Sequence, residues 1–259
     1  MQKMITVVPL VAALALSAAG CSSSSSSGSS PTPTAASSTS QDHSQILTTY
    51  FNAYGTRNPT TMAAMLSSAA KDSPAYVFGQ HQINTSLAYL SDNIDPIPLT
   101  VTVAGDTVTT VDELPADATA NERAAATSVY RDFQFSPEGL IQTWTTVPGG
   151  PLAPRIAAQS ATATKSAVTV SLKTSYQTPA GGLFLTYDVS NGSTTGTSVA
   201  VVGYVNPDGR QVSSDNTPPK LSPHPAAFTT GRSHISNGIR GGQLIVQFAD
   251  RSTAKLAVS

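Results

Sequence analysis

Apolar side chains recur at helical spacing between residues 44 and 90. In the first stretch they fall on one face, with Asp42 as the expected N-cap and Gly55 as the expected end. Asn58-Pro59 and Ser73-Pro74 each pair a capping side chain with a proline at the first helical position. The pattern therefore predicts three helices, and Gly79 weakens the signal within the third.

The apolar spacing changes to every second residue after Ile97. Apolar and threonine side chains alternate, and the turn signals Gly105-Asp106 and Ser136-Pro137-Glu138-Gly139 separate strand-like runs. Helices followed by hairpins predict an α+β domain in which N-terminal helices pack on an antiparallel sheet. The expected strands cover, in chain order, residues 97–103, 108–114, 129–135 and 140–147.

The second half of the sequence contains no helical pattern of useful length. Short alternating apolar runs are separated by turn signals such as Asn191-Gly192 and Asp208-Gly209, a pattern typical of a β-sandwich. The segment Pro148–Pro154 holds three prolines and two glycines, which neither a helix nor a central strand accommodates. We therefore place a boundary there, between an α+β domain over residues 42–150 and an all-β domain over residues 151–259.

Charge is distributed unevenly between these two halves. Residues 42–150 contain eleven acidic and four basic side chains, a net charge of -7, whereas residues 151–259 contain four acidic and nine basic ones, a net charge of +5. The whole chain has a net charge of -1. A protein without a general positive field is a poor candidate for nucleic-acid binding, so no nucleic-acid partner is expected.

The first twenty residues have the layout of a secretory signal, with Lys3, an apolar run and small residues before Cys21. This arrangement resembles a bacterial lipoprotein signal, which implies cleavage before Cys21 and attachment of lipid to that residue. An ordinary cleaved signal peptide is the alternative. Residues 21–41 then form a tether of small polar residues and proline. The expected location is extracytoplasmic, with the protein anchored to the outer face of the bacterial cell membrane.

Short segments of the α+β half resemble a known family. Tyr50–Tyr54, Met62–Ala70 and Ser73–Tyr76 resemble the opening helices of nuclear-transport-factor-like domains in actinobacterial surface lipoproteins, and Phe133–Trp144 resembles their late hairpin. Leu183–Asn191 and Val199–Gly209 resemble the immunoglobulin-like domains of secreted actinobacterial proteins. The resemblance implies a cone made by helices and a curved antiparallel sheet, followed by an immunoglobulin-like β-sandwich.

The cone of this family often holds an apolar pocket, and some relatives of polyketide-cyclase or isomerase type place an acid/base pair in it. Asp132 with His81 is the candidate pair here, although a solvated Asp132 beside Arg131 is the simpler interpretation. Large side chains outnumber ionisable ones among the expected lining residues, which favours binding over proton transfer. The candidate pocket residues are Tyr54, Tyr76, His81, Tyr130, Asp132 and Trp144.

A basic segment between Gly231 and Gly242 is a second candidate site, with Arg232, His234 and Arg240. We expect a solvated loop. The alternatives are contact with anionic lipid headgroups, with cell-wall polymer, or with the acidic first half of the same chain, which is always present at high effective concentration.

Motifs of the common enzyme classes are absent from the sequence. The four histidines lack ligand spacing, and the S-x-x-K matches at Ser68 and Ser252 occur without the K-T-G motif of penicillin-interacting enzymes. No metal or cofactor is therefore expected. The sequence favours a membrane-anchored, non-catalytic module that binds a small apolar ligand or a cell-envelope component; an acid/base enzyme and a structural spacer are the alternatives.

Overall fold

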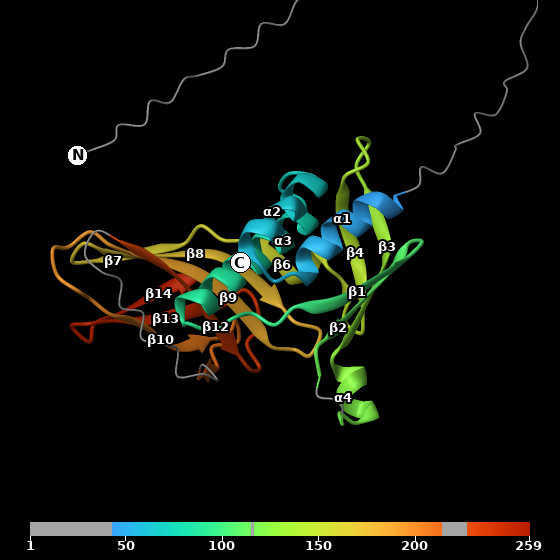
Figure 1. Ribbon diagram of the computed structural model, residues 1–259. Helices are drawn as coiled ribbons and strands as arrows, with labels where there is room; N and C mark the ends of the chain where they lie inside the picture. Colours follow the sequence, from blue (N-terminus) through green and yellow to red (C-terminus); the bar gives the residue numbers. More distant parts are fainter. Residues whose placement is uncertain (1–42, 115–116, 214–226) are drawn as a thin grey trace, which may run out of the picture. The chain divides into compact units, whose positions relative to one another are not determined.

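Four helices and a five-stranded antiparallel sheet form the first part of the chain, and three of the helices precede the sheet (Figure 1). The computed structural model describes residues 43–114, 117–213 and 227–259. The strand order in the sheet is β1-β2-β3-β4-β5. The elements are α1 (Ser44–Gly55), α2 (Pro59–Ser68), α3 (Pro74–Ser91), β1 (Leu99–Ala104), β2 (Thr107–Asp112), α4 (Ala120–Ala125), β3 (Thr127–Phe135), β4 (Ile141–Val147) and β5 (Gly150–Pro151).

The helix starts at Asn58 and Ser73 are confirmed. The Asn58 side chain accepts hydrogen bonds from the backbone N–H groups of Thr60 and Thr61, at 3.0 and 3.2 Å, and Ser73 Oγ accepts one from Tyr76 at 3.2 Å. The predicted extent of α1 is confirmed, since the helix runs from Ser44 to Gly55, but the predicted N-cap was wrong, because His43 is the N-cap and makes no capping side-chain bond. Asp42 lies outside the described residues.

Helix α3 runs without interruption through Gly79. A Cβ atom at this position would lie 3.0 Å from Leu66 Cδ2 and 3.3 Å from Met65 Cβ, both on α2. The glycine that weakens the helical signal in the sequence therefore allows α2 and α3 to approach closely, and packing outweighs the intrinsic cost of glycine in a helix.

The second part of the chain consists of two antiparallel sheets, with strand orders β11-β10-β13-β14 and β12-β9-β8-β6, and β7 also pairs with β8. The chain is thus of mixed α+β class with antiparallel sheets, as predicted. The elements are the 3-10 helix η1 (Ala153–Arg155) and the strands β6 (Ile156–Ala158), β7 (Thr162–Lys165), β8 (Val168–Gln177), β9 (Leu183–Asn191), β10 (Val199–Val205), β11 (Gln211–Val212), β12 (Phe228–Ile235), β13 (Gln243–Phe248) and β14 (Thr253–Ala257).

The buried side chains form two separate clusters. The first joins α1, α2 and α3 to the five-stranded sheet and has Trp144, only 1% exposed, among its largest members. The second joins apolar residues of both later sheets, for example Leu185 of β9 and Val246 of β13. Alternate residues of β9 and β13 are buried, which is the expected pattern for strands with one face in a core.

Helix α3 contacts elements of both parts of the chain. It packs on β4 of the first sheet, and also on β12, β8, β9 and β6 of the second part. The contacts with the second part are both aromatic and polar. The Phe78 ring lies 5.6 Å from that of Tyr176, His81 Nδ1 lies 2.7 Å from Thr174 Oγ1, and Thr174 Oγ1 in turn lies 2.6 Å from Thr186 Oγ1. Helix α3 therefore packs against both the first sheet and the second part of the chain, and its C-terminal end forms part of the pocket described below.

The predicted signal peptide (residues 1–20), the tether (residues 21–41) and Cys21 lie outside the described residues. Within the part of the chain that is described, no helix combines the length and apolar character needed to cross a bilayer.

Candidate functional site

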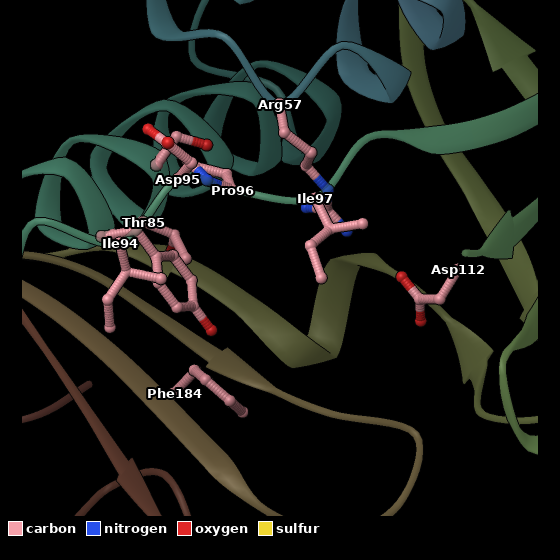
Figure 2. A pocket seen from close by; sticks show the side chains of 10 residues that line it. Arg57, Thr85, Ile94, Asp95, Pro96, Ile97, Asp112 and Phe184 are labelled. Atoms are coloured by element: carbon pink, nitrogen blue, oxygen red, sulfur yellow. The ribbon is translucent and has the colours of Figure 1, made fainter. Parts of the chain in front are cut away.

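A pocket of about 340 Å³ lies at the C-terminal end of α3 (Figure 2). Its walls come from four places in the chain: the loop after α1, the second half of α3 with the segment that follows it, the end of β2, and β9. In Figure 2, Phe184 lies opposite Ile94 and Ile97, and Asp112 lies to one side. The lining residues are Arg57, Thr85, Ser86, Tyr89, Ile94, Asp95, Pro96, Ile97, Asp112 and Phe184.

The end of α3 has the geometry of a Schellman motif, which positions two lining residues. Asn93 adopts a left-handed backbone conformation (φ 58°), as asparagine does more readily than most residues. The N–H of Ile94 donates to the carbonyl of Tyr89 at 2.9 Å, and the N–H of Asn93 donates to that of Leu90 at 3.0 Å. This motif commonly brings its two outer residues together, and here Tyr89 and Ile94 both line the pocket.

The apolar part of the wall is unusually accessible. Ile94 and Ile97 are 46% and 64% exposed, and Pro96 lies between them in a segment without regular secondary structure, where its ring prevents the helix from continuing. Phe184 is half-buried and stacks on His234, with 4.3 Å between the ring centroids. The wall therefore presents branched and aromatic surface at one place, as ligand pockets do.

Arg57 is the cationic member of the lining. It follows α1 in a left-handed backbone conformation (φ 54°) and is half-buried. Its Nη1 donates to Gln82 Oε1 at 2.8 Å, and its Cζ lies 4.5 Å from the centroid of the Tyr54 ring. These two contacts, a charge-to-amide hydrogen bond and a cation–π contact, fix the guanidinium at the pocket wall.

Behind the pocket, Tyr89 also contacts the second part of the chain. Arg232 Cζ lies 3.8 Å from the centroid of the Tyr89 ring, and Arg232 Nη2 lies 3.5 Å from Asp92 Oδ2. Partial burial raises the pKa of Asp92, and the attraction of Arg232 opposes this shift. One pocket residue is thus part of the contact between α3 and β12.

Three of the residues predicted for the cone are buried in the first core cluster: Tyr54, Tyr130 and Trp144. The rings of Phe51, Phe78 and Tyr130 surround Trp144, with centroids 5.3 to 6.0 Å away. Tyr76, near the start of α3, packs against the same cluster. The pocket at the end of α3 is lined by other residues.

The structure does not bring His81 and Asp132 together. His81 is 2% exposed and faces Thr174 of β8, whereas the Asp132 side chain is 66% exposed on β3 and lies 3.6 Å from Arg131 Nε. Burial, with a smaller contribution from the Arg57 charge, lowers the pKa of His81 to about 3. The imidazole is therefore neutral at physiological pH.

The basic segment begins as a strand, where we expected a loop, because residues up to Ile235 pair with β9. Arg232 faces α3 and its side chain is 14% exposed, so contact with the acidic half replaces the expected solvation. Arg240, after the strand, donates hydrogen bonds to the carbonyls of Pro154 and Ser259, at 2.7 and 3.1 Å. His234 stacks on Phe184 and so lies behind a pocket residue.

No pattern in the sequence singles out Arg57, Tyr89, Ile97 or Phe184 as lining residues. One local signal was present: Ile94 and Ile97 are apolar residues in a proline-containing segment that belongs to neither a helix nor a buried strand. The contribution of Phe184 depends on the packing of α3 against β9, which no local pattern reveals.

The chemistry of the lining favours binding. Tyr89 makes no hydrogen bond to the two carboxylates of the lining, and none of the lining residues is a histidine. Over the described ranges, no group of three or more metal-ligating side chains is found. The pocket thus offers apolar surface, one guanidinium and exposed carboxylates, without a coupled acid and base.

No protein-family model matches the chain, and no match was found among curated proteins. Among solved structures, the chain is similar to the crystal structure of a conserved hypothetical protein from Bacillus anthracis, with 8% sequence identity and a TM-score of 0.20. The likeness covers 61% of this chain and 92% of that chain. A TM-score this low supports no conclusion about fold or function.

Proposed function

We propose that this protein is a membrane-anchored extracytoplasmic lipoprotein that binds a small amphiphilic molecule without transforming it. The observation that carries the binding proposal is the pocket at the end of α3, where Tyr89, Ile97 and Phe184 converge from two parts of the chain. Exposed apolar surface gathered in a concave site is costly in water and is typical of ligand sites.

We further propose that the first half is a nuclear-transport-factor-like cone and that the second half is an immunoglobulin-like sandwich. The first proposal is supported by the order of three helices before an antiparallel sheet, and the second by two antiparallel sheets that share one core. Both folds serve as scaffolds for many activities, so the function rests on the pocket and not on the fold.

The lipid anchor is tested at Cys21. Metabolic labelling with a fatty acid is expected to mark the wild-type protein and to leave a Cys21→Ala variant unmarked, because this thiol is the proposed attachment point. Equal labelling of the two proteins would contradict the lipoprotein assignment and would leave an ordinary signal peptide.

The pocket is tested with N-phenylnaphthylamine, a neutral fluorophore that brightens in apolar surroundings. The full chain is made by cell-free synthesis without membranes, so that no acyl group or micelle competes for the probe. We expect saturable binding, and we expect Phe184→Ala to weaken it about tenfold because an aromatic wall is removed.

The matched control is Phe228→Ala. Phe228 is 71% exposed and does not line the pocket, so its loss is expected to leave the probe affinity unchanged. Equal weakening by both substitutions, or no saturable binding to the wild type, would contradict the binding proposal.

A further inference from the structure

Arg57 places a positive charge in the pocket wall that no carboxylate neutralises. Over residues 43–114, 117–213 and 227–259, the ion pairs are Arg131 with Asp132, Lys173 with Asp188 and Arg232 with Asp92. Arg57 belongs to none of them. A half-buried charge without a counter-ion is costly, and the cost falls when an anion binds beside it.

The two contacts of Arg57 leave most of its hydrogen-bonding capacity free. A guanidinium has five N–H donors, and the contact with Gln82 uses a single donor at Nη1. The Tyr54 ring makes a cation–π contact with the guanidinium, which uses none of its N–H donors in a conventional hydrogen bond. A planar carboxylate matches the remaining donors, because it can accept two parallel hydrogen bonds from one guanidinium.

The charge of Arg57 acts on its surroundings. It contributes, after burial, to the lowered pKa of His81. The positive charge of Arg57 thus disfavours protonated His81 in the interior, and it favours an anion at the accessible side of the guanidinium.

The carboxylates of the lining limit how much negative charge a ligand can carry. Asp95 and Asp112 are both exposed, and neither pairs with Arg57. In Figure 2 the Asp112 side chain lies on the other side of Ile97 from Ile94, at one end of the pocket. A ligand with several negative groups would meet repulsion there, whereas a ligand with one would reach Arg57 with its apolar body between Ile97 and Phe184.

We propose that the pocket selects a monoanionic amphiphile, with one carboxylate paired to Arg57 and an apolar, preferably aromatic, body against Tyr89, Ile97 and Phe184. This proposal rests on the binding function proposed above and names the class of its ligand. A cavity of about 340 Å³ is of the size that holds a single small ligand of this kind.

The test compares three probes of one shape: naphthoate, the neutral naphthamide and the cationic naphthylmethylammonium. Binding to the unacylated full chain is measured by isothermal titration calorimetry. We expect naphthoate to bind roughly tenfold to a hundredfold more tightly than naphthamide, the range for a charge-assisted hydrogen bond, and the cation to bind more weakly than either.

Variants at Arg57 test whether this residue causes the preference for naphthoate over naphthamide. Arg57→Gln is expected to abolish the preference for naphthoate over naphthamide, and Arg57→Lys to keep part of it, because the charge remains while the planar fork of donors is lost. The matched control is Arg131→Gln, which removes an exposed arginine from β3 and is expected to keep the full preference.

Failure of this inference is distinguishable from failure of the proposed function. If N-phenylnaphthylamine binds but naphthoate and naphthamide bind the wild type equally, the pocket exists and the anion preference is wrong. The same conclusion follows if folded Arg57→Gln keeps the preference. If no probe binds the wild type, the binding function itself is wrong.

Discussion

Lowering the pH from 7 to 4 is expected to reduce the free energy of unfolding by about 3 kcal/mol through His81 alone. The imidazole is buried and neutral in the folded protein, with a pKa of about 3, whereas in the unfolded chain it titrates near its ordinary value of 6.5. Between these two values the unfolded state binds the additional proton. The stability is therefore complete above pH 6.5 and declines steadily as the pH falls toward 3.

The measurement is urea unfolding at several pH values for the wild type and for His81→Gln. The variant is expected to be less stable at pH 7, because the contact with Thr174 is altered, but to lose less stability on acidification. Asp92 has the opposite effect on stability during acidification. Because its pKa is raised in the folded protein, protonation of this carboxyl stabilises the folded state relative to the unfolded state. Because Asp92 is common to both proteins, it cancels in the difference between the two curves.

His43→Gln is the control for the general effect of replacing a histidine, since His43 is half-buried at the start of α1 and stacks on Phe135. Parallel pH dependence of wild type and His81→Gln would contradict the assignment of a neutral, buried imidazole. A second readout is the NMR signal of the His81 ring, which is expected to stay constant down to pH 4.

The elements that the sequence predicts well are those whose signals are local. Asn58 and Ser73 start helices because each side chain accepts hydrogen bonds from backbone groups two or three residues away. Period-two alternation likewise predicts β9 and β13, since each strand has one face in a core. These effects depend on neighbours in the chain, so they can be found without knowing the fold.

Strand β12 shows where this reasoning fails. Its buried positions include Thr230, Gly231 and Ser233, which are too small and polar to stand out in a sequence. Gly231 and Ser233 alternate with Ile235 on the face toward the second core cluster, whereas Thr230 and Arg232 lie on the opposite face. On that face α3 packs over the strand, and Arg232 contacts Tyr89 and Asp92. A polar interface between two parts of one chain has no hydrophobic period, and the basic segment was therefore predicted as a loop.

The pocket was missed for a related reason. Arg57, Ile97 and Phe184 follow one another at long intervals in the sequence and meet only because α3 contacts both parts of the chain. The aromatic residues that the sequence does concentrate, around Trp144, fill the core of the first half. A dense set of aromatic residues predicts a core and a ligand pocket equally well until the packing is known.

Replacement of Trp144 by alanine is expected to lower the free energy of unfolding by about 3 to 5 kcal/mol, the range for deleting a large buried aromatic side chain. The indole contacts the rings of Tyr50, Phe51 and Phe78, so its removal leaves a cavity lined by rigid aromatic side chains. Trp144→Phe is expected to cost less, because it keeps one ring and removes an indole N–H that has no hydrogen-bond partner.

Urea unfolding measures both substitutions, and Phe228→Ala, on an exposed side chain, is the control with an expected change within about 0.5 kcal/mol. The same Trp144→Phe protein then separates the two candidate sites. If the probe binds at the end of α3, the Trp144→Phe variant is expected to bind N-phenylnaphthylamine with an affinity within about twofold of the wild type, because Trp144 does not line that pocket. A tenfold loss of probe affinity in a folded Trp144→Phe protein would place the ligand among the aromatic rings of the first half, as the family resemblance implies. The pocket beside Arg57 would then not be the ligand site.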